Sequence, residues 1–306
     1  MRSTLIAILA GGAALLHLYS AGVAPLTALV LRPLHLALLG ALGFLRASDS
    51  EDRIRLGAAL PALGLFATCL YLVSQNEQLV ARAGTAQPLD LVAGALTIVL
   101  VLELTRRTVG VAMVIVASAA LIYGLAGPWL PGLLAHRGYG IERIIEHLYL
   151  GTEGIWGVPL GVSADFVFLF VLFGTLLDNA GGGQLLIGLA RRIAGDTPGA
   201  PAKTAAVSSA LMGSLSGSAV ANVVTTGSLT IPMMKRAGFA PHLAGAIEAA
   251  ASTGGQIVPP VMGAGAFILA TWTNIPYYPG RSGRGDSSTA LLRSNAGGDS
   301  LLGSAR

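Results

Sequence analysis

The sequence predicts an all-α polytopic membrane protein with about six full transmembrane helices, followed by a re-entrant helical hairpin and a broken helix. Its 306 residues are 53% hydrophobic and only 11% charged, whereas a soluble domain carries roughly 25% charged residues. The mean hydropathy is +0.70. In addition, Gly, Pro and small polar residues interrupt the apolar stretch 205–263 twice. Unwound backbone survives inside a bilayer only where protein buries it or where it lines a polar cavity.

Six apolar segments come first along the chain. A helix needs about 20 mostly apolar residues to cross the hydrocarbon core of a bilayer. By this measure the predicted spans are 3–22, 28–45, 56–75, 89–105, 108–127 and 158–178.

Basic residues orient these spans. If each span crosses once, three clusters fall on one side together with Arg2; they are Arg46, Arg53 and Arg55, then Arg106 and Arg107, then Arg191, Arg192 and Lys203. The positive-inside rule makes that side cytoplasmic. We therefore expect a multi-pass protein of the cell inner membrane with a cytoplasmic N-terminus, and outward-facing stretches at 76–88 and 128–157. The clustering is an orientation signal, so the expected surroundings are a lipid bilayer and not a nucleic acid.

The next basic pair, Lys235 and Arg236, predicts the hairpin. Only 31 residues, 204–234, separate Lys203 from Lys235. A single crossing would place the pair outside, and two full crossings need about 40 residues. A hairpin that enters from the cytoplasm, turns within 213–226 and returns satisfies both limits. Residues 242–271 then cross outward, with an interruption at 254–260.

Small polar side chains stand at the expected turn: Ser214, Ser216, Ser218 and Asn222. Hydroxyl and amide oxygens, with carbonyls freed from helical bonding, are neutral ligands that suit a small hard cation such as Na⁺, and Ser216 and Asn222 are the candidate metal ligands. The alternative is that small residues only let helices pack closely. Because the charge topology requires a hairpin here, we favour an ion site.

The second interruption contains Gly254, Gly255, Pro259 and Pro260. Proline lacks an N–H and clashes with the preceding helical turn, so a proline pair breaks a helix. Alone, this pattern would indicate a proline kink whose gap is filled by neighbouring residues. Beside the hairpin it indicates that the two breaks meet near the middle of the membrane and form a site.

Acidic residues within the apolar segments are costly and therefore informative. Glu103 lies three and four residues before Arg106 and Arg107, which predicts a local ion pair. We expect Glu248 to reach the cytoplasmic surface or to pair with the basic residues at 235–236. The single cysteine, Cys69, lies in an apolar run and is predicted to be a packing residue. No nucleophile–base pair, HExxH or P-loop pattern is present, so we predict no enzyme and no cofactor apart from a coupling ion.

Five runs resemble the permeases of tripartite ATP-independent periplasmic (TRAP) transporters, in the fused small- and large-subunit type that works with TAXI-class solute-binding proteins. The two most specific are ALMGSLSGSAVANVVTTGSLTIPMMKRAGF and AIEAAASTGGQIVPPVMGAGAFILA. The resemblance implies a small-subunit-like region over 1–127 and the first of two inverted repeats of the large transport domain over 128–276. It also implies import of a carboxylate solute with a cation gradient, usually Na⁺, after delivery by a periplasmic protein. Ion or substrate contact is thereby implied for Ser214, Ser216, Gly217, Ser218, Asn222, Gly254, Gly255, Pro259 and Pro260.

The last residues depart from that pattern. Residues 277–306 lose the apolar composition and are rich in Gly, Ser and Arg, which is typical of a disordered tail. We hypothesise that the chain is truncated, with its second repeat on a separate fragment. The alternative is a structural or vestigial membrane protein that keeps the breaks but does not transport.

Overall fold

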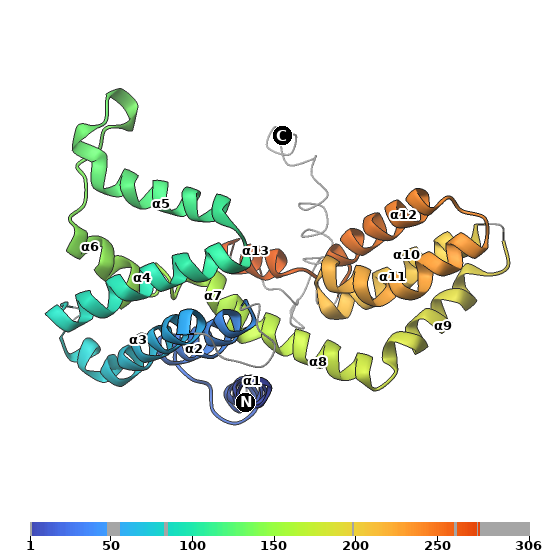
Figure 1. Cartoon of the computed structure of the whole chain (residues 1–306), viewed down its shortest axis with the longest axis horizontal. Coiled ribbons are helices and arrows are strands. Elements are labelled where there is room, and N and C mark those ends of the chain that lie inside the picture. The colour runs from blue at the N-terminus through green and yellow to red at the C-terminus, as the bar shows by residue number, and fades with distance from the viewer. Residues whose placement is uncertain are drawn as a thin grey trace, which may run out of the picture. The chain divides into compact units, whose positions relative to one another are not determined.

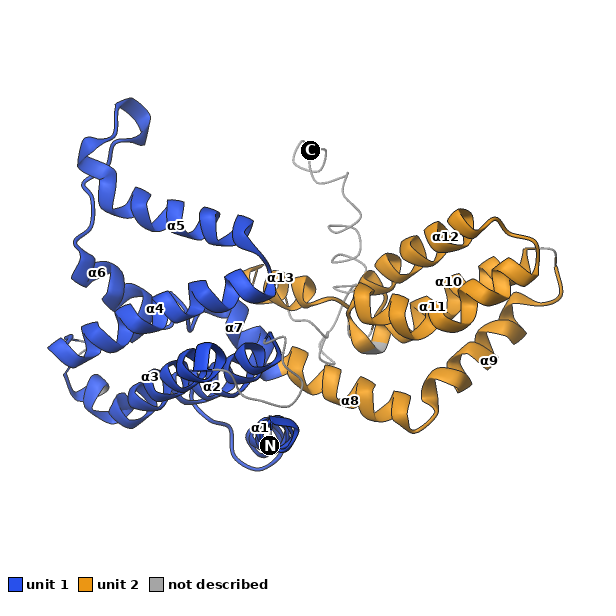
Figure 2. Cartoon of the chain, in the orientation of Figure 1, with its two compact units in different colours: residues 1–165 blue, residues 166–306 orange. Residues whose placement is uncertain are grey.

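The computed structural model describes residues 2–47, 56–82, 85–197, 199–259, 262–273 and 275, and every regular element within them is a helix (Figure 1). This confirms the predicted all-α class. The chain divides into two compact units, Met1–Asp165 and Phe166–Arg306 (Figure 2). The predicted tail, 277–306, lies outside the described residues.

The six predicted spans are all present as long apolar helices. They are α1 (Arg2–Gly22), α2 (Ala28–Arg46), α3 (Leu56–Ala81), α4 (Pro88–Thr108), α5 (Val111–Ala126), and a helical stretch over Val158–Asn179. The last stretch consists of α7 (Val158–Val162), a π-turn (Ser163–Val167) and α8 (Phe168–Asn179). The protein is therefore a multi-pass membrane protein. The largest difference from the predicted boundaries is in α3, which continues beyond residue 75 to Ala81.

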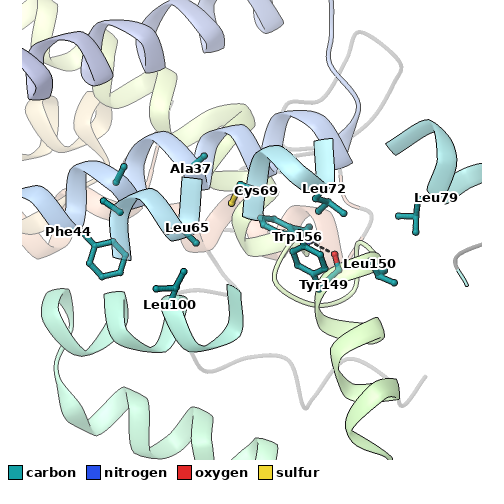
Figure 3. Close-up of a cluster of buried hydrophobic side chains, with 12 residues drawn as sticks. Ala37, Phe44, Leu65, Cys69, Leu72, Leu79, Leu100, Tyr149, Leu150 and Trp156 are labelled. Carbon is teal, nitrogen blue, oxygen red and sulfur yellow. Dashed lines mark hydrogen bonds between the residues drawn. The ribbon is translucent and has the colours of Figure 1, made fainter. Parts of the chain in front are cut away.

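The core of the first unit joins α2, α3 and α4 to a segment that lies outside the predicted spans. Phe44, Leu65 and Leu100 pack together, and Cys69 is buried in the same cluster, as predicted (Figure 3). Tyr149 and Trp156, from the stretch 128–157, are fully buried there. Their polar atoms are paired: the Tyr149 hydroxyl donates to the Thr68 carbonyl at 2.6 Å, and the Trp156 indole donates to the Tyr149 carbonyl at 2.6 Å. Two aromatic anchors thus tie this stretch, including α6 (Ile141–Ile145), to the helices.

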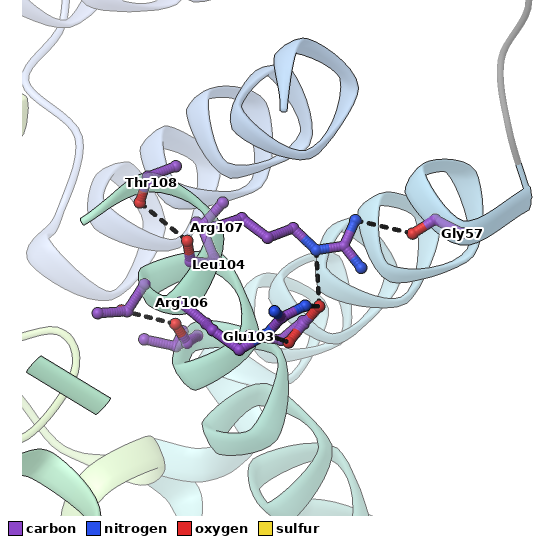
Figure 4. Close-up of polar contacts among 8 residues, drawn as sticks. Gly57, Glu103, Leu104, Arg106, Arg107 and Thr108 are labelled. Carbon is purple, nitrogen blue, oxygen red and sulfur yellow. Dashed lines mark hydrogen bonds and ion pairs between the residues drawn. The ribbon is translucent and has the colours of Figure 1, made fainter. Parts of the chain in front are cut away.

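The ion pair predicted at the end of α4 is confirmed. Glu103 accepts hydrogen bonds from Arg106 Nε at 2.7 Å and from Arg107 Nε at 2.6 Å (Figure 4). Arg107 also donates to the Gly57 carbonyl at 2.9 Å, which links the end of α4 to the beginning of α3. The two arginines thus supply hydrogen-bond donors to the Glu103 carboxylate at this basic end of the helix.

The second unit is built around a helical hairpin. The helices of this unit are α8, α9 (Gly182–Ala194), α10 (Ala200–Ser216), α11 (Ala219–Arg236), α12 (Pro241–Gly254) and α13 (Ala264–Thr273). α10 packs against α9, α11 and α12. A proline in the first turn favours the beginning of α10, and lysine and arginine in the last turn of α11 suit the negative end of its dipole. The predicted hairpin is therefore present as α10 and α11.

Candidate functional site at two helix breaks

The turn of the hairpin is much tighter than the predicted stretch 213–226. α10 continues to Ser216, and Gly217 ends it in the left-handed conformation with φ +62°. Glycine is the residue that adopts this conformation without steric cost. Ser218 then caps α11, since its hydroxyl accepts a hydrogen bond from the Ala221 N–H at 3.3 Å. Only two residues are non-helical, because one left-handed glycine and one cap suffice to reverse the chain.

The second break is longer. α12 ends at Gly254, a 3₁₀ turn covers Gly255–Ile257, and α13 begins at Ala264. Met262 has φ +57°, a conformation that side-chain-bearing residues rarely adopt. Such strained backbone gathers at functional sites. The interruption predicted at 254–260 is thus confirmed for the described residues, and the next described helix begins after Gly263.

The two breaks are in direct contact. A Cβ atom on Gly213 would lie 2.6 Å from the Gly255 Cα, and a Cβ atom on Gly217 would clash with the Met262 carbonyl. Asn222 completes the junction, because its side-chain amide donates to the Ser209 carbonyl at 2.8 Å beside Gly255. The prediction that the breaks meet is therefore confirmed. Backbone approaches backbone here because neither glycine carries a side chain.

A cavity of about 960 Å³ opens at this junction, a size typical of ligand sites. Both breaks line it, and so does the aromatic end of α13. The lining residues with the most relevant chemistry are Ser216, Ser218, Gln256, Met262, Phe267 and Trp272. Phe267 stacks on Phe166 with ring centroids 5.1 Å apart, which fixes the apolar wall. None of the described residues around the cavity is charged, so its polar groups are hydroxyls, backbone groups, one amide and the Trp272 indole.

The predicted site residues divide into three groups. Ser216, Gly217 and Ser218 line the cavity. Ser214, Asn222 and Gly255 are buried and do not line it, and the Ser214 hydroxyl donates to the Leu211 carbonyl at 2.7 Å. Gly254 and Pro259 are exposed and do not line it. Pro260 lies outside the described residues.

Sequence reasoning missed several cavity residues. Gln256 stands directly in the second break, and an amide between glycine and proline in an apolar segment is a signal that could have found it. Phe267 and Trp272 gave no such signal, because aromatic residues also occur at lipid-facing positions. Met262 carries no polar group, and only its backbone conformation sets it apart.

Glu248 corrects a prediction. It neither reaches the surface nor pairs with Lys235 or Arg236, which are both exposed. Instead its side chain is fully buried between α10, α11 and α12. Four hydroxyl groups contact the carboxylate; they belong to Ser209 at 3.0 Å, Thr226 at 2.5 Å, Ser252 at 3.1 Å, and Thr230.

Comparisons with known proteins indicate the family to which the chain belongs. The family model of the tripartite ATP-independent periplasmic transporter, DctM component, matches residues 96–279. A putative TRAP transporter large permease protein of Haemophilus influenzae is 27% identical over 59% of this chain and 39% of its own length. The isethionate TRAP transporter permease protein DctMQ of Oleidesulfovibrio alaskensis is 34% identical over 49% of this chain and 22% of its own. The 2,3-diketo-L-gulonate TRAP transporter large permease protein YiaN of Escherichia coli is 31% identical over 30% of this chain and 21% of its own.

The chain thus matches only between about a fifth and two-fifths of the length of these curated relatives. No solved structure matches it. The family model covers more than half of the chain and includes both helix breaks and the cavity between them. The chain therefore belongs to the DctM family of tripartite ATP-independent periplasmic transporters, a family of transporter permeases and not of enzymes.

Proposed function

We propose that this chain acts in the permease of a binding-protein-dependent secondary transporter in the cell inner membrane. The permease imports a small carboxylate together with Na⁺, and a periplasmic solute-binding protein of the TAXI class delivers the solute. One observation carries the proposal: two helix breaks from separate parts of the chain meet and line one uncharged cavity.

The helix ends at the cavity favour both a cation and an anion. α10 ends at Ser216, and the 3₁₀ turn that extends α12 ends at Ile257, so carbonyl groups are directed toward the breaks. α11 begins at Ala219 and α13 begins at Ala264, so free N–H groups are directed there as well. Carbonyl ends stabilise cations and N–H ends stabilise anions. Broken helices supply this pair of environments in secondary transporters.

The Ser216 hydroxyl adds a neutral oxygen at the carbonyl end of α10, and the Ser218 hydroxyl adds another at the beginning of α11. Oxygen ligands suit hard cations, and an uncharged set avoids the cost of a fixed charge in the membrane. Relatives named for isethionate and 2,3-diketo-L-gulonate are named for anions, which supports an anionic solute near the N–H ends. Asn222 does not line the cavity. Its side-chain amide donates a hydrogen bond to the Ser209 carbonyl and thereby stabilises the backbone at the junction of the two breaks.

Binding of radioactive sodium to the purified full chain in lipid nanodiscs tests the ion site. We expect saturable binding that Ser216→Ala weakens at least several-fold and Ser216→Thr retains, because threonine keeps the hydroxyl. Ser228→Ala is the matched control, since that exposed serine lies on α11 away from the cavity. Equal sodium binding in wild type and Ser216→Ala would contradict the proposed site. A complete lack of sodium binding would favour the structural, non-transporting interpretation instead.

A further inference from the structure

Glu248 and the hydroxyl groups around it form a second polar centre in the unit Phe166–Arg306. We call the four surrounding hydroxyl groups the hydroxyl cage; they belong to Ser209 on α10, Thr226 and Thr230 on α11, and Ser252 on α12. All four residues and Glu248 itself are almost fully buried. α11 comes close at Gly227, where a Cβ atom would lie 3.0 Å from the Glu248 Cγ. Three helices therefore converge on one carboxyl group.

No cationic side chain among the described residues forms an ion pair with this carboxyl group. The charged and titratable side chains on the three helices are otherwise Lys203, Lys235, Arg236 and His242, and all four are exposed. Isolated charges are expensive to bury, so such a group neutralises or gathers hydrogen bonds. Here only hydroxyl groups supply those bonds.

Hydroxyl groups suit both charge states of a carboxyl group, because each one can donate or accept. When Glu248 is ionised, the hydroxyls donate to its two oxygens. When Glu248 is protonated, it donates to one hydroxyl, and that hydroxyl can turn to a backbone carbonyl. Such carbonyls are in reach: Thr226 Oγ1 lies 2.8 Å from the Asn222 carbonyl, and Thr230 Oγ1 lies 3.0 Å from the Thr226 carbonyl. Arginine or amide donors would instead have fixed the ionised form.

A metal ion does not fit between these oxygens. Calcium-sized hard cations hold six or more oxygens at about 2.3–2.6 Å and keep them apart around the ion. The Thr226 hydroxyl and a Glu248 carboxylate oxygen already lie 2.5 Å from one another, and the Ser209 and Thr226 hydroxyls are 3.2 Å apart. A proton is the cation that this arrangement accommodates.

The cage is also connected to the junction of the two helix breaks. Thr226 Oγ1 lies 3.4 Å from the Asn222 side-chain oxygen, and the Asn222 amide donates to the backbone carbonyl of Ser209 beside Gly255. A change in the direction of the Thr226 hydroxyl therefore alters the hydrogen bonds of the residue that holds the breaks together.

We propose that Glu248 is a proton-binding site: its carboxylate takes up a proton from water and releases it again, and the hydroxyl cage reorients to satisfy both forms. The site is separate from the sodium site proposed above. Its protonation changes the hydrogen bonding of Asn222 and thereby the junction of the breaks.

Infrared difference spectroscopy of the full chain in lipid nanodiscs, recorded as a function of pH, tests this proposal. We expect a C=O stretching band of a protonated carboxyl group that titrates, disappears in Glu248→Gln and persists in Glu103→Gln. Identical pH-dependent spectra in wild type and Glu248→Gln would overturn the proposal. A Glu248 band that stays constant over the whole pH range in which the protein remains folded would overturn it as well.

A pair of cage variants covers the case in which Glu248→Gln does not fold. Thr230→Val removes a hydroxyl that contacts the carboxyl group, so the frequency of the Glu248 band should shift, whereas Thr230→Ser keeps the hydroxyl and should leave the band in place. An unchanged band in Thr230→Val would contradict the role of the cage. The readout is the carboxyl group itself, so it depends on neither sodium binding nor uptake.

Discussion

Gly213 and Gly255 allow the hairpin and the broken helix to come into backbone contact. A Cβ atom added at Gly213 would lie within 3.0 Å of the Cα, the carbonyl carbon and the carbonyl oxygen of Gly255. Backbone atoms move less easily than the end of a flexible side chain, so any side chain at Gly213 has to push the two elements apart. The site therefore depends on residues that contribute no chemical group of their own.

We predict that Gly213→Ala destabilises the protein by about 1–3 kcal/mol, as expected for overpacking. Gly245→Ala is the matched control, because an added Cβ there meets nothing within 4 Å, and alanine in a helix should be neutral or stabilising by about 0.4–1 kcal/mol. The midpoints of thermal unfolding in detergent measure both effects. A Gly213→Ala midpoint at or above that of Gly245→Ala would contradict the close contact.

At the scale of the elements, the sequence predicts the hairpin, but it does not predict which of the hairpin's residues face the cavity. The count of residues between Lys203 and Lys235 and the positive-inside rule leave a hairpin as the only consistent path. Which serine reaches the cavity depends on the rotation of α10 in its last turn: Ser216 lines the cavity and Ser214 bonds to its own helix. The cage around Glu248 was not predictable either, because packing of three helices brings together residues as far apart as Ser209 and Ser252.

The hairpin predicts that both of its ends lie on the cytoplasmic side. Cys69 is the only cysteine and is buried, so single cysteines can be introduced at the exposed positions Lys203 and Arg236. A membrane-impermeant maleimide should label both only after spheroplasts are permeabilised. Leu133→Cys, fully exposed in the predicted outward stretch, should be labelled in intact spheroplasts. Labelling of positions 203 and 236 from opposite sides would exclude a hairpin that enters and returns.

At the scale of the whole molecule, the six apolar helices and the two breaks followed from composition, charge and the positions of Gly and Pro. The burial of Tyr149 and Trp156 did not, because the stretch 128–157 has a mixed composition and its anchoring depends on tertiary packing. The division into units at Asp165 likewise reflects contacts that no local pattern reports. Membership of the DctM family and contact between the two breaks are established, and the central claim of the proposed function is that Na⁺ occupies the cavity.

The labelling rate of a cysteine placed between the two breaks measures that occupation most directly. In Gly263→Cys the new side chain would be in ordinary contact with Gln256 and Gly217, at the edge of the cavity. Gly245→Cys, with open space around it, is the control. Sodium should slow the maleimide reaction at position 263 relative to choline and leave the rate at position 245 unchanged. Equal rates at position 263 in sodium and in choline would contradict a sodium site between the breaks.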